Sequence, residues 1–305
     1  MSVIFEKLAI IGCGLIGSSI ARAARETGAA GSIAVSDISA DVIARVKALG
    51  LADEASPDAS EAARGADCVI LCAPVGVCGK ITEAIAAVLK PGAILSDVSS
   101  VKGAIARSCG PHVPPGVHFV PGHPVAGTEH SGPDAGFASL FSNRWCILTP
   151  PEGTDPEAVA KVEAFWKALG SNIEIMTPDH HDLVLAITSH IPHLIAYNIV
   201  GTANDLEMVT EGEVIKFSAG GFRDFTRIAA SDPTMWRDVF LHNKQAVLEM
   251  VARFNEDLAA LARMIRWDDG EGLHELFTRT RAIRRSIIAS GQESDEPNFG
   301  RDKKG

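Results

Sequence analysis

Three glycines near the N-terminus constrain the fold of this chain more than any other feature. Gly12, Gly14 and Gly17 lie between a short apolar run and an amphipathic stretch. In this setting Gly12 permits a tight turn, Gly14 lets a pyrophosphate approach the backbone, and Gly17 lets a helix pack closely on a strand. The first helical residues, Leu15 and Ile16, would then offer N–H groups and a partial positive charge to phosphates. The pattern predicts a dinucleotide-binding strand–turn–helix.

An acidic residue indicates which dinucleotide is bound. Asp37 lies 20 residues beyond Gly17, at the end of the second apolar run. A carboxylate there accepts hydrogen bonds from ribose hydroxyls and repels a 2′-phosphate, and the following residue is Ile38 rather than arginine. We therefore expect NAD rather than NADP. Alternatively, Asp37 caps the next helix, a role that Ser39 fills equally well.

The first 176 residues alternate short apolar runs with alanine-rich helical stretches. Because the runs are apolar on both faces, they predict a mostly parallel sheet covered by helices, that is, an α/β Rossmann-type domain. The expected strands are Leu8–Ile11, Ser32–Ser36, Cys68–Cys72, Ala93–Asp97, Val117–Pro121, Trp145–Leu148 and Asn172–Ile175.

The pattern becomes helical after this domain. Thr177-Pro178 and Asp232-Pro233 each resemble an N-cap residue followed by proline at the first helical position. No convincing strand follows. We expect residues 177–291 to form an all-helical domain for substrate binding and dimerisation.

One predicted helix argues for a second subunit. From Pro233, apolar residues recur at steps of three and four for ~30 residues, or ~45 Å at 1.5 Å per residue. A helix of that length would leave apolar surface uncovered within its own domain, so we expect a homodimer. The polar stretch Gln292–Gly305 has no apolar pattern and is expected to be a disordered tail.

Composition excludes several classes of partner. The formal net charge of −10 offers no basic field for nucleic acid. The six cysteines form no CxxC pair, so we expect reduced thiols and no metal site. No basic-then-apolar leader precedes the first strand, and no apolar run approaches the ~20 residues that span a bilayer. We expect a cytoplasmic protein without a membrane partner.

Rossmann sheets bind ligands beyond the carboxyl ends of their strands. Ala73 and Pro74 follow one predicted strand, and Ser99 lies in the segment Asp97–Lys102 that follows another. These three residues are expected to contact the cofactor.

A histidine follows the next predicted strand, in the segment Gly122–Glu129. His123 could accept a proton during an alcohol oxidation, since an unperturbed imidazole titrates near ~6.5. We expect an apparent pKa near that value unless its neighbours move it. Taken alone, His123 could also be a hydrogen-bonded loop histidine.

Four segments carry a resemblance to a known family. These are Asp97–Lys102, Gly122–Glu129 (GHPVAGTE), Ser189–His193 (SHIPH) and Gly220–Trp236 (GGFRDFTRIAASDPTMW). In their order and spacing they resemble the motifs of the prephenate/arogenate (cyclohexadienyl) dehydrogenases. The resemblance covers roughly Lys7 to Ile288, nearly the whole chain.

The resemblance implies an oxidative decarboxylation in tyrosine biosynthesis. NAD would take hydride from the ring carbon that bears the hydroxyl, while the ring carboxylate leaves as CO2. His123 would accept the hydroxyl proton, and Ser100 would bind that hydroxyl or orient the imidazole. Arg227 would bind a substrate carboxylate, for which a guanidinium offers two parallel donors.

The resemblance also implies substrate contacts in the helical half. His190 and His193 are three residues apart on a predicted helix and so share a face; they would lie by the nicotinamide and the substrate side chain. Alternatively they form a polar patch where Pro192 frees a backbone carbonyl. Gly220 and Trp236 are further candidate substrate contacts, although a tryptophan is usually a core residue.

Charged residues near these motifs allow two interpretations. Glu129, Arg223 and Asp224 could form ion pairs that close the site mouth, with Glu129 as a substrate contact, or could be solvated surface charges.

Two other classes stay open on sequence alone. One is another Rossmann-plus-helical dehydrogenase of the β-hydroxyacid or imine-reductase type, which would need an acid lysine; Lys216 is the nearest candidate. The other is a dinucleotide-binding protein without catalysis, against which His123 and Arg227 argue. The sequence does not decide between prephenate and arogenate. Because no ACT or chorismate mutase module accompanies the two domains, any inhibition by tyrosine is expected at the substrate site.

Overall fold

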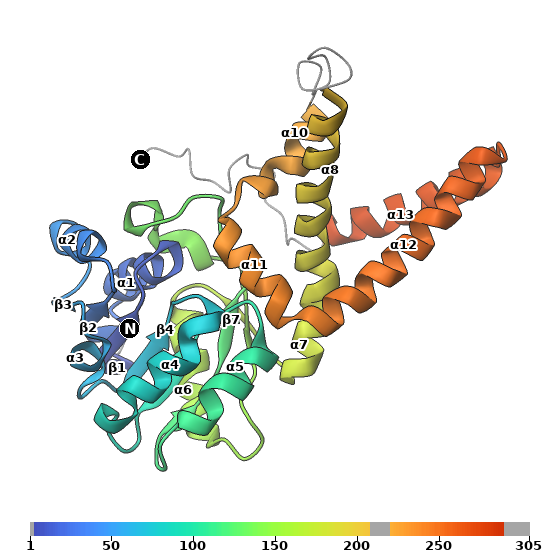
Figure 1. The fold of residues 1–305 in the computed structure, drawn as a ribbon. Coiled ribbons are helices and arrows are strands. Elements are labelled where there is room, and N and C mark those ends of the chain that lie inside the picture. Colours follow the sequence, from blue (N-terminus) through green and yellow to red (C-terminus); the bar gives the residue numbers. More distant parts are fainter. Residues whose placement is uncertain (1–2, 208–219, 290–305) are drawn as a thin grey trace. The chain divides into compact units, whose positions relative to one another are not determined.

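The computed structural model describes residues 3–207 and 220–289 (Figure 1). Two compact units are present, Met1–Val247 and Leu248–Gly305. The predicted tail, Gln292–Gly305, and the candidate Lys216 lie outside the described residues.

The larger unit is built on a six-stranded parallel sheet in the order β3-β2-β1-β4-β5-β6. This is the strand order of a Rossmann fold, with the ligand-binding crevice between β1 and β4 where the order reverses. The fold-class prediction is confirmed. The strands are β1 Phe5–Ile11, β2 Ala30–Ser36, β3 Glu54–Ser56, β4 Cys68–Leu71, β5 Ile94–Asp97 and β6 His118–Phe119.

A smaller three-stranded sheet continues the chain. Its strands are β7 Gly122–Pro124, β8 Trp145–Leu148 and β9 Asn172–Ile175. β8 lies in the middle, antiparallel to β7 and parallel to β9. His123 is thus the central residue of a short strand, opposite Ile147.

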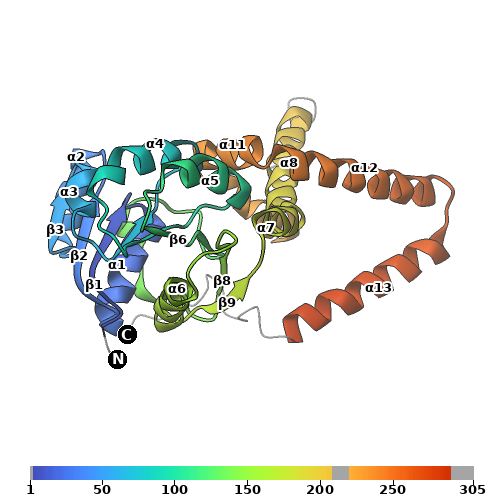
Figure 2. The same cartoon turned by 90° about the horizontal axis from the view of Figure 1, so that it is seen from below.

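Helices cover both faces of the parallel sheet. Figure 2 shows α4 and α5 on one side of the sheet and α1 and α6 on the other. The helices are α1 Leu15–Thr27, α2 Ala40–Ala48, α3 Ala59–Ala63, α4 Val75–Ile85, α5 Lys102–Cys109, α6 Pro156–Ala168, α7 Pro178–Leu185, α8 Ile191–Glu207, α10 Gly220–Thr226, α11 Pro233–His242, α12 Lys244–Arg266 and α13 Gly270–Ala289, with the π-helical turn Ala186–His190 between α7 and α8.

The two faces of the sheet bury separate apolar clusters because successive strand residues point to opposite sides. In β1, Leu8 and Ile10 join the cluster that includes Trp166 of α6. Ala9 and Ile11 join the second cluster, which includes Trp236 of α11. A tryptophan of the helical half therefore belongs to the core of the nucleotide-binding half.

The strand predictions differ from the structure at the sheet edges. The strand predicted at Val117–Pro121 is shorter in the structure, where β6 covers only His118–Phe119. The next strand, β7, was not predicted. The edge strand β3 was also missed, because three residues with polar ends carry no apolar run.

The prediction of one continuous helix from Pro233 is wrong, because the structure has two helices there. The helical turns are interrupted at Asn243, which has φ −105° and ψ 30° and separates α11 from α12. The apolar periodicity continues across the break, so periodicity alone could not reveal it.

The helices of the smaller unit carry exposed apolar side chains. Leu258 and Ile265 of α12 are 51% and 65% exposed, and Phe277 and Ile283 of α13 are 56% and 55% exposed. Such a surface normally binds another protein surface.

One helical run in the larger unit, Pro178–Leu206, is long and apolar enough by length and composition alone to cross a membrane. It also carries buried polar residues, including His181, Asp182 and His190. Its α7 segment packs against α5 of the sheet domain (Figure 1). About 28% of its most apolar stretch is buried within the described structure.

Candidate active site

The glycine turn follows β1 and requires glycine at two of its positions. Gly12 has φ +97°, and a Cβ there would lie 2.6 Å from the Cys72 carbonyl oxygen. A Cβ on Gly17 would collide with the Gly12 carbonyl oxygen. Gly14 is the N-cap of α1, and a Cβ on it would meet no atom within 4 Å. The turn therefore leaves open space at the N-terminus of α1, as a bound pyrophosphate requires.

Asp37 lies beside this turn. One carboxylate oxygen accepts a hydrogen bond from the Cys13 N–H at 2.9 Å, and the other accepts from the Ser39 N–H at 2.9 Å. Ser39 is the N-cap of α2 and accepts from the Val42 N–H. The helix-capping alternative for Asp37 is therefore wrong. The turn and the carboxylate together fit the pyrophosphate and ribose of NAD.

The other predicted cofactor contacts follow β4 and β5. Pro74 is the N-cap of α4 and is exposed, with the half-buried Ala73 before it. Ser99 is buried, and its N–H donates to Asp97 at 2.8 Å. All three lie beyond the carboxyl ends of central strands, as predicted.

A buried ion pair connects the two sheets. Lys102 Nζ lies 2.6 and 2.8 Å from the Asp97 carboxylate oxygens, and both side chains are fully buried. The same ammonium group donates to the Gly122 carbonyl at 2.6 Å. Because one charge-assisted contact holds the backbone next to His123, the pair fixes where this histidine stands. Sequence reasoning assigned Lys102 no role.

His123 belongs to a chain of three buried groups. Its Nδ1 lies 2.8 Å from His181 Nε2, and His181 Nδ1 lies 2.8 Å from an Asp182 carboxylate oxygen. Asp182 also accepts from the Lys102 and Gly103 N–H groups at 2.8 and 2.9 Å. Sequence reasoning missed His181 and Asp182, although the adjacent His-His-Asp at the start of the helical half was a visible signal.

The directions of these hydrogen bonds follow from the acceptor-only carboxylate. An ionised Asp182 requires a hydrogen on His181 Nδ1, so in neutral His181 the Nε2 atom is an acceptor. His123 must then donate through Nδ1. The Nε2 atom of neutral His123 is left with its lone pair, as a general base requires.

The surroundings keep this chain uncharged apart from the carboxylate. The pKa of His123 lies well below its ordinary value because of burial, with His181, Lys102 and His190 adding to the effect. Burial also lowers the pKa of His181, against the opposing effect of Asp182. Burial would raise the pKa of Asp182, but its hydrogen bonds from His181, Lys102 and Gly103 outweigh that and lower it.

The predicted pair of histidines meets one tryptophan. The His193 ring stacks on Trp236, with ring centroids 3.6 Å apart and an angle of 22° between the ring planes. The His190 ring meets Trp236 edge to face, with ring centroids 6.1 Å apart. His193 Nδ1 donates to the Ser189 carbonyl at 2.9 Å. Trp236 is also buried in the core. It therefore combines the core role with direct contact to both histidines.

Arg227 forms an ion pair with Glu129, which lies 98 residues earlier in the sequence. The Arg227 Nη1 atom lies 3.1 Å from the Glu129 carboxylate, and the two side chains are 43% and 28% exposed. Arg223 and Asp224 instead lie 3.8 Å from each other and are about four-fifths exposed. Two interpretations of these charges were open, ion pairs or solvated surface charges. The contact of Glu129 with Arg227 fits an ion pair, whereas the exposure of Arg223 and Asp224 fits solvated surface charges.

Two predicted residues have fewer contacts. Ser100 precedes α5 and is half-buried; within the described chain its hydroxyl forms no hydrogen bond to His123. Gly220 is the first residue of α10 and is half-buried.

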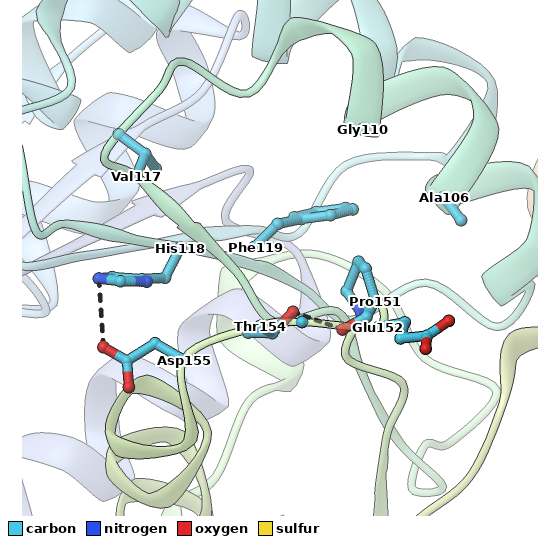
Figure 3. Close-up of a pocket in the computed structure, with 10 residues that line it drawn as sticks. Ala106, Gly110, Val117, His118, Phe119, Pro151, Glu152, Thr154 and Asp155 are labelled. Atoms are coloured by element: carbon cyan, nitrogen blue, oxygen red, sulfur yellow. Dashed lines mark hydrogen bonds and ion pairs between the residues drawn. The ribbon is translucent and has the colours of Figure 1, made fainter.

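A cavity of about 460 Å³ lies elsewhere, at the edge strand β6. In this cavity His118 Nε2 lies 3.9 Å from an Asp155 carboxylate oxygen. Figure 3 shows these two side chains with Phe119, Glu152 and Thr154 nearby. None of the predicted site residues lines it.

The cysteines lie in the described part of the chain, and all six are free. Burial raises the pKa of the Cys13 thiol to about 12 and that of Cys72 well above its ordinary value. Among the described residues, no group of three or more His, Cys, Asp or Glu side chains is arranged to hold a metal ion.

Comparison with known families decides the relationship. A model described as "Prephenate dehydrogenase, nucleotide-binding domain" matches residues 20–175, and one described as "Prephenate dehydrogenase, dimerization domain" matches residues 177–279. The chain belongs to the prephenate dehydrogenase family. Members of this family are NAD-dependent dehydrogenases, so this chain is one too, and the predicted resemblance is confirmed.

Relatives of the prephenate dehydrogenase family match most of this chain. The cyclohexadienyl dehydrogenase of Zymomonas mobilis is 41% identical over 284 residues, covering 93% of this chain and 97% of that protein. The prephenate dehydrogenase of Bacillus subtilis is 32% identical, covering 93% of this chain and 76% of that protein.

Solved structures of the same family share the fold. Prephenate dehydrogenase from Aquifex aeolicus, in complex with hydroxyphenyl propionate and NAD+, superposes with a TM-score of 0.87 at 33% identity, covering 94% of this chain and 99% of that one. The arogenate dehydrogenase of Synechocystis gives a TM-score of 0.77 at 29% identity, covering 92% and 99%. Membership of this family sets aside the β-hydroxyacid and non-catalytic alternatives.

Proposed function

We propose that this prephenate dehydrogenase family member oxidatively decarboxylates prephenate, arogenate or both, giving 4-hydroxyphenylpyruvate, tyrosine or both, in tyrosine biosynthesis. The observation that carries the proposal is the buried chain from Asp182 through His181 to His123. It leaves a basic Nε2 atom on β7, a strand that contacts the carboxyl end of β5. NAD supplies the hydride acceptor when bound.

The cofactor site is proposed to consist of the residues predicted for it. The glycine turn and the start of α1 would hold the pyrophosphate, and Asp37 the ribose. Residues beyond β4 and β5 would line the nicotinamide side. The set is Gly12, Gly14, Leu15, Ile16, Gly17, Asp37, Ala73, Pro74 and Ser99.

At the reacting carbon, His123 Nε2 would take the proton of the ring hydroxyl as hydride leaves that carbon. The bond between the ring and its carboxylate breaks in the same overall reaction, and its electron pair completes the aromatic ring as CO2 departs. The ring oxygen then takes back the proton from His123 Nε2, which restores the neutral base. Ser100 would bind the hydroxyl. Because His123 is buried and neutral, its lone pair is available without prior loss of a proton.

Substrate binding is proposed for residues of the helical half. Arg227 would bind a substrate carboxylate and exchange its contact with Glu129 as the substrate enters. His190, His193, Trp236 and Gly220 would form the remaining wall.

A homodimer through the helical half is proposed, within a division into residues 1–176 and 177–291. The matched dimerisation domain and the exposed apolar residues of α12 and α13 support it. Sedimentation at micromolar concentration should show twice the chain mass of 32.2 kDa. A particle of single-chain mass would contradict the dimer. We also propose a cytoplasmic location, with neither nucleic acid nor membrane as partner.

The direct test is steady-state kinetics with both substrates, following NADH and CO2 together. We expect turnover with at least one substrate and equal yields of the two products. If neither prephenate nor arogenate is turned over, the proposed function is wrong.

A further inference from the structure

Asn243 interrupts the helical turns between α11 and α12 and faces the interior. Its side chain is 5% exposed. The side-chain nitrogen lies 2.8 Å from the Asp182 carbonyl oxygen and 3.1 Å from His190 Nδ1. Asn243 therefore connects Asp182, whose side chain contacts His181, to His190 of the predicted substrate wall.

The orientation of this amide is decided by chemistry. A backbone carbonyl can only accept, so the Asn243 atom facing the Asp182 carbonyl must be the NH2 group. That group has two hydrogens. One is donated to the carbonyl, and the other points to His190 Nδ1, which must then hold a lone pair.

The proton of neutral His190 is consequently on Nε2. His190 is fully buried, and burial lowers its pKa to about 4, against the opposing effect of Asp182. His190 Nε2 forms no hydrogen bond of ordinary geometry with the described residues. The Ser100 backbone raises the pKa of His190, so this ring lies close to Ser100. A buried N–H without a well-formed hydrogen bond costs about 1–3 kcal/mol, so the site favours a ligand oxygen at this position.

The π-helical turn Ala186–His190 supports the same reading. It ends at His190 and widens the backbone between α7 and α8. Such turns inside helices are frequent at functional sites because they redirect one side chain.

We propose that Asn243 is a positioning residue that holds His190 as an Nε2–H donor for an acceptor oxygen on the ligand bound beside Ser100. This inference rests on the proposed function, which puts Ser100 at the substrate hydroxyl. The acceptor is a carbonyl or carboxylate oxygen, supplied by the nicotinamide carboxamide or by the substrate.

The first test is ¹⁵N NMR of the whole protein labelled at histidine, with the His190 signals identified by their loss in His190→Gln. We expect His190 at neutral pH to carry its proton on Nε2 and not on Nδ1. Addition of NAD alone should shift the Nε2 signal if the carboxamide is the acceptor. Addition of 4-hydroxyphenylpyruvate alone should shift it if the substrate is. A proton on His190 Nδ1 would overturn the inference. So would an Nε2 signal that does not shift with NAD, with 4-hydroxyphenylpyruvate, or with the two added together.

The second test is Asn243→Asp, which replaces the donor with an acceptor of the same shape. It should draw a proton onto His190 Nδ1 and lower kcat/KM by about 10-fold or more, the effect of one lost hydrogen bond. Asn172→Asp is the same change at an exposed residue of β9, so it should leave the His190 signals and kcat/KM unchanged. Unchanged His190 signals in folded Asn243→Asp would contradict the proposal, and if this variant does not fold, the wild-type spectrum decides. That spectrum needs no turnover, so failure of the proposed reaction is recognised separately.

Discussion

His123 Nδ1 lies 2.8 Å from His181 Nε2, and this contact joins a residue of the small sheet to the first helix of the helical half. The two rings meet edge to face, with centroids 5.0 Å apart. Since His181 is held in turn by Asp182, the base is oriented by groups 58 and 59 residues away in sequence. Catalysis in this protein is therefore expected to depend on how α7 seats against the nucleotide-binding half.

Removing the base should affect turnover more than binding. His123→Asn keeps a polar side chain but loses the proton acceptor. We expect kcat to fall by about 10²- to 10⁴-fold with little change in KM, because the proton moves only as the transition state forms. Steady-state kinetics measures both constants. Wild-type kcat in His123→Asn would contradict the assignment.

The acid limb of kcat/KM should lie below the pH expected for a free imidazole. Burial and the neighbouring His181, Lys102 and His190 hold the pKa of His123 well below its ordinary value. As pH falls, the base stays neutral through about 6.5 and is lost only at lower pH, as it becomes protonated. Profiles of kcat/KM between about pH 4 and 8 test this, in a range where circular dichroism shows the fold intact. A limb centred near or above 6.5 would contradict it.

Asp182 should matter without touching substrate. Asp182→Asn can turn its amide N–H toward His181 and so favour the other tautomer of both rings, removing the lone pair from His123 Nε2. We expect a loss in kcat of roughly 10- to 1,000-fold, within the range that a general base contributes.

His180→Gln is the matched control for that variant. His180 is the exposed neighbour of His181 on α7, so its replacement should leave kcat unchanged. Equal activity of Asp182→Asn and wild type would rule out the orienting role.

Arg227 should contribute mainly to binding. Arg227→Gln removes a charge-assisted contact made from the first encounter, so KM should rise by about 30- to 1,000-fold, equivalent to ~2–4 kcal/mol. Some loss of kcat is expected because the ring carboxylate changes charge as CO2 leaves. Arg25→Gln is the control, since Arg25 is similarly exposed and paired with Asp53 at the far end of α1. An unchanged KM for both substrates would show that Arg227 binds neither.

Asp37 should determine the preference for NAD over NADP. Asp37→Ser removes the charge that repels a 2′-phosphate, so the ratio of kcat/KM for NAD to that for NADP should fall by about 10-fold, or ~1.4 kcal/mol. Asp41→Ser removes the same charge from the exposed first turn of α2 and should leave the ratio unchanged. Equal use of both cofactors by the wild type would refute this reading of Asp37.

Local patterns in the sequence were sufficient for the nucleotide-binding half. The glycine turn, Asp37 and the central strands depend on residues close together in the chain, where glycine geometry and apolar runs act directly. Gly12 shows why: its positive φ and its contact with the Cys72 carbonyl follow from one strand–turn–helix and its neighbouring strand. The strands β3 and β7 were not predicted and β6 was predicted too long, because strands of two or three residues carry too little pattern. The predicted bounds of β1, β2, β4 and β5 differ from the structure by one to three residues.

Family motifs extended the reading to His123 and Arg227, but they did not reveal what supports these residues. Burial of Lys102 against Asp97, the orientation of His123 by His181 and Asp182, and the interruption of a regular helix at Asn243 all depend on contacts between distant segments. A lysine or histidine looks the same in sequence whether it is solvated or buried. Only the tertiary structure decides its desolvation and its hydrogen-bond partners, and these set which nitrogen of each imidazole carries the proton.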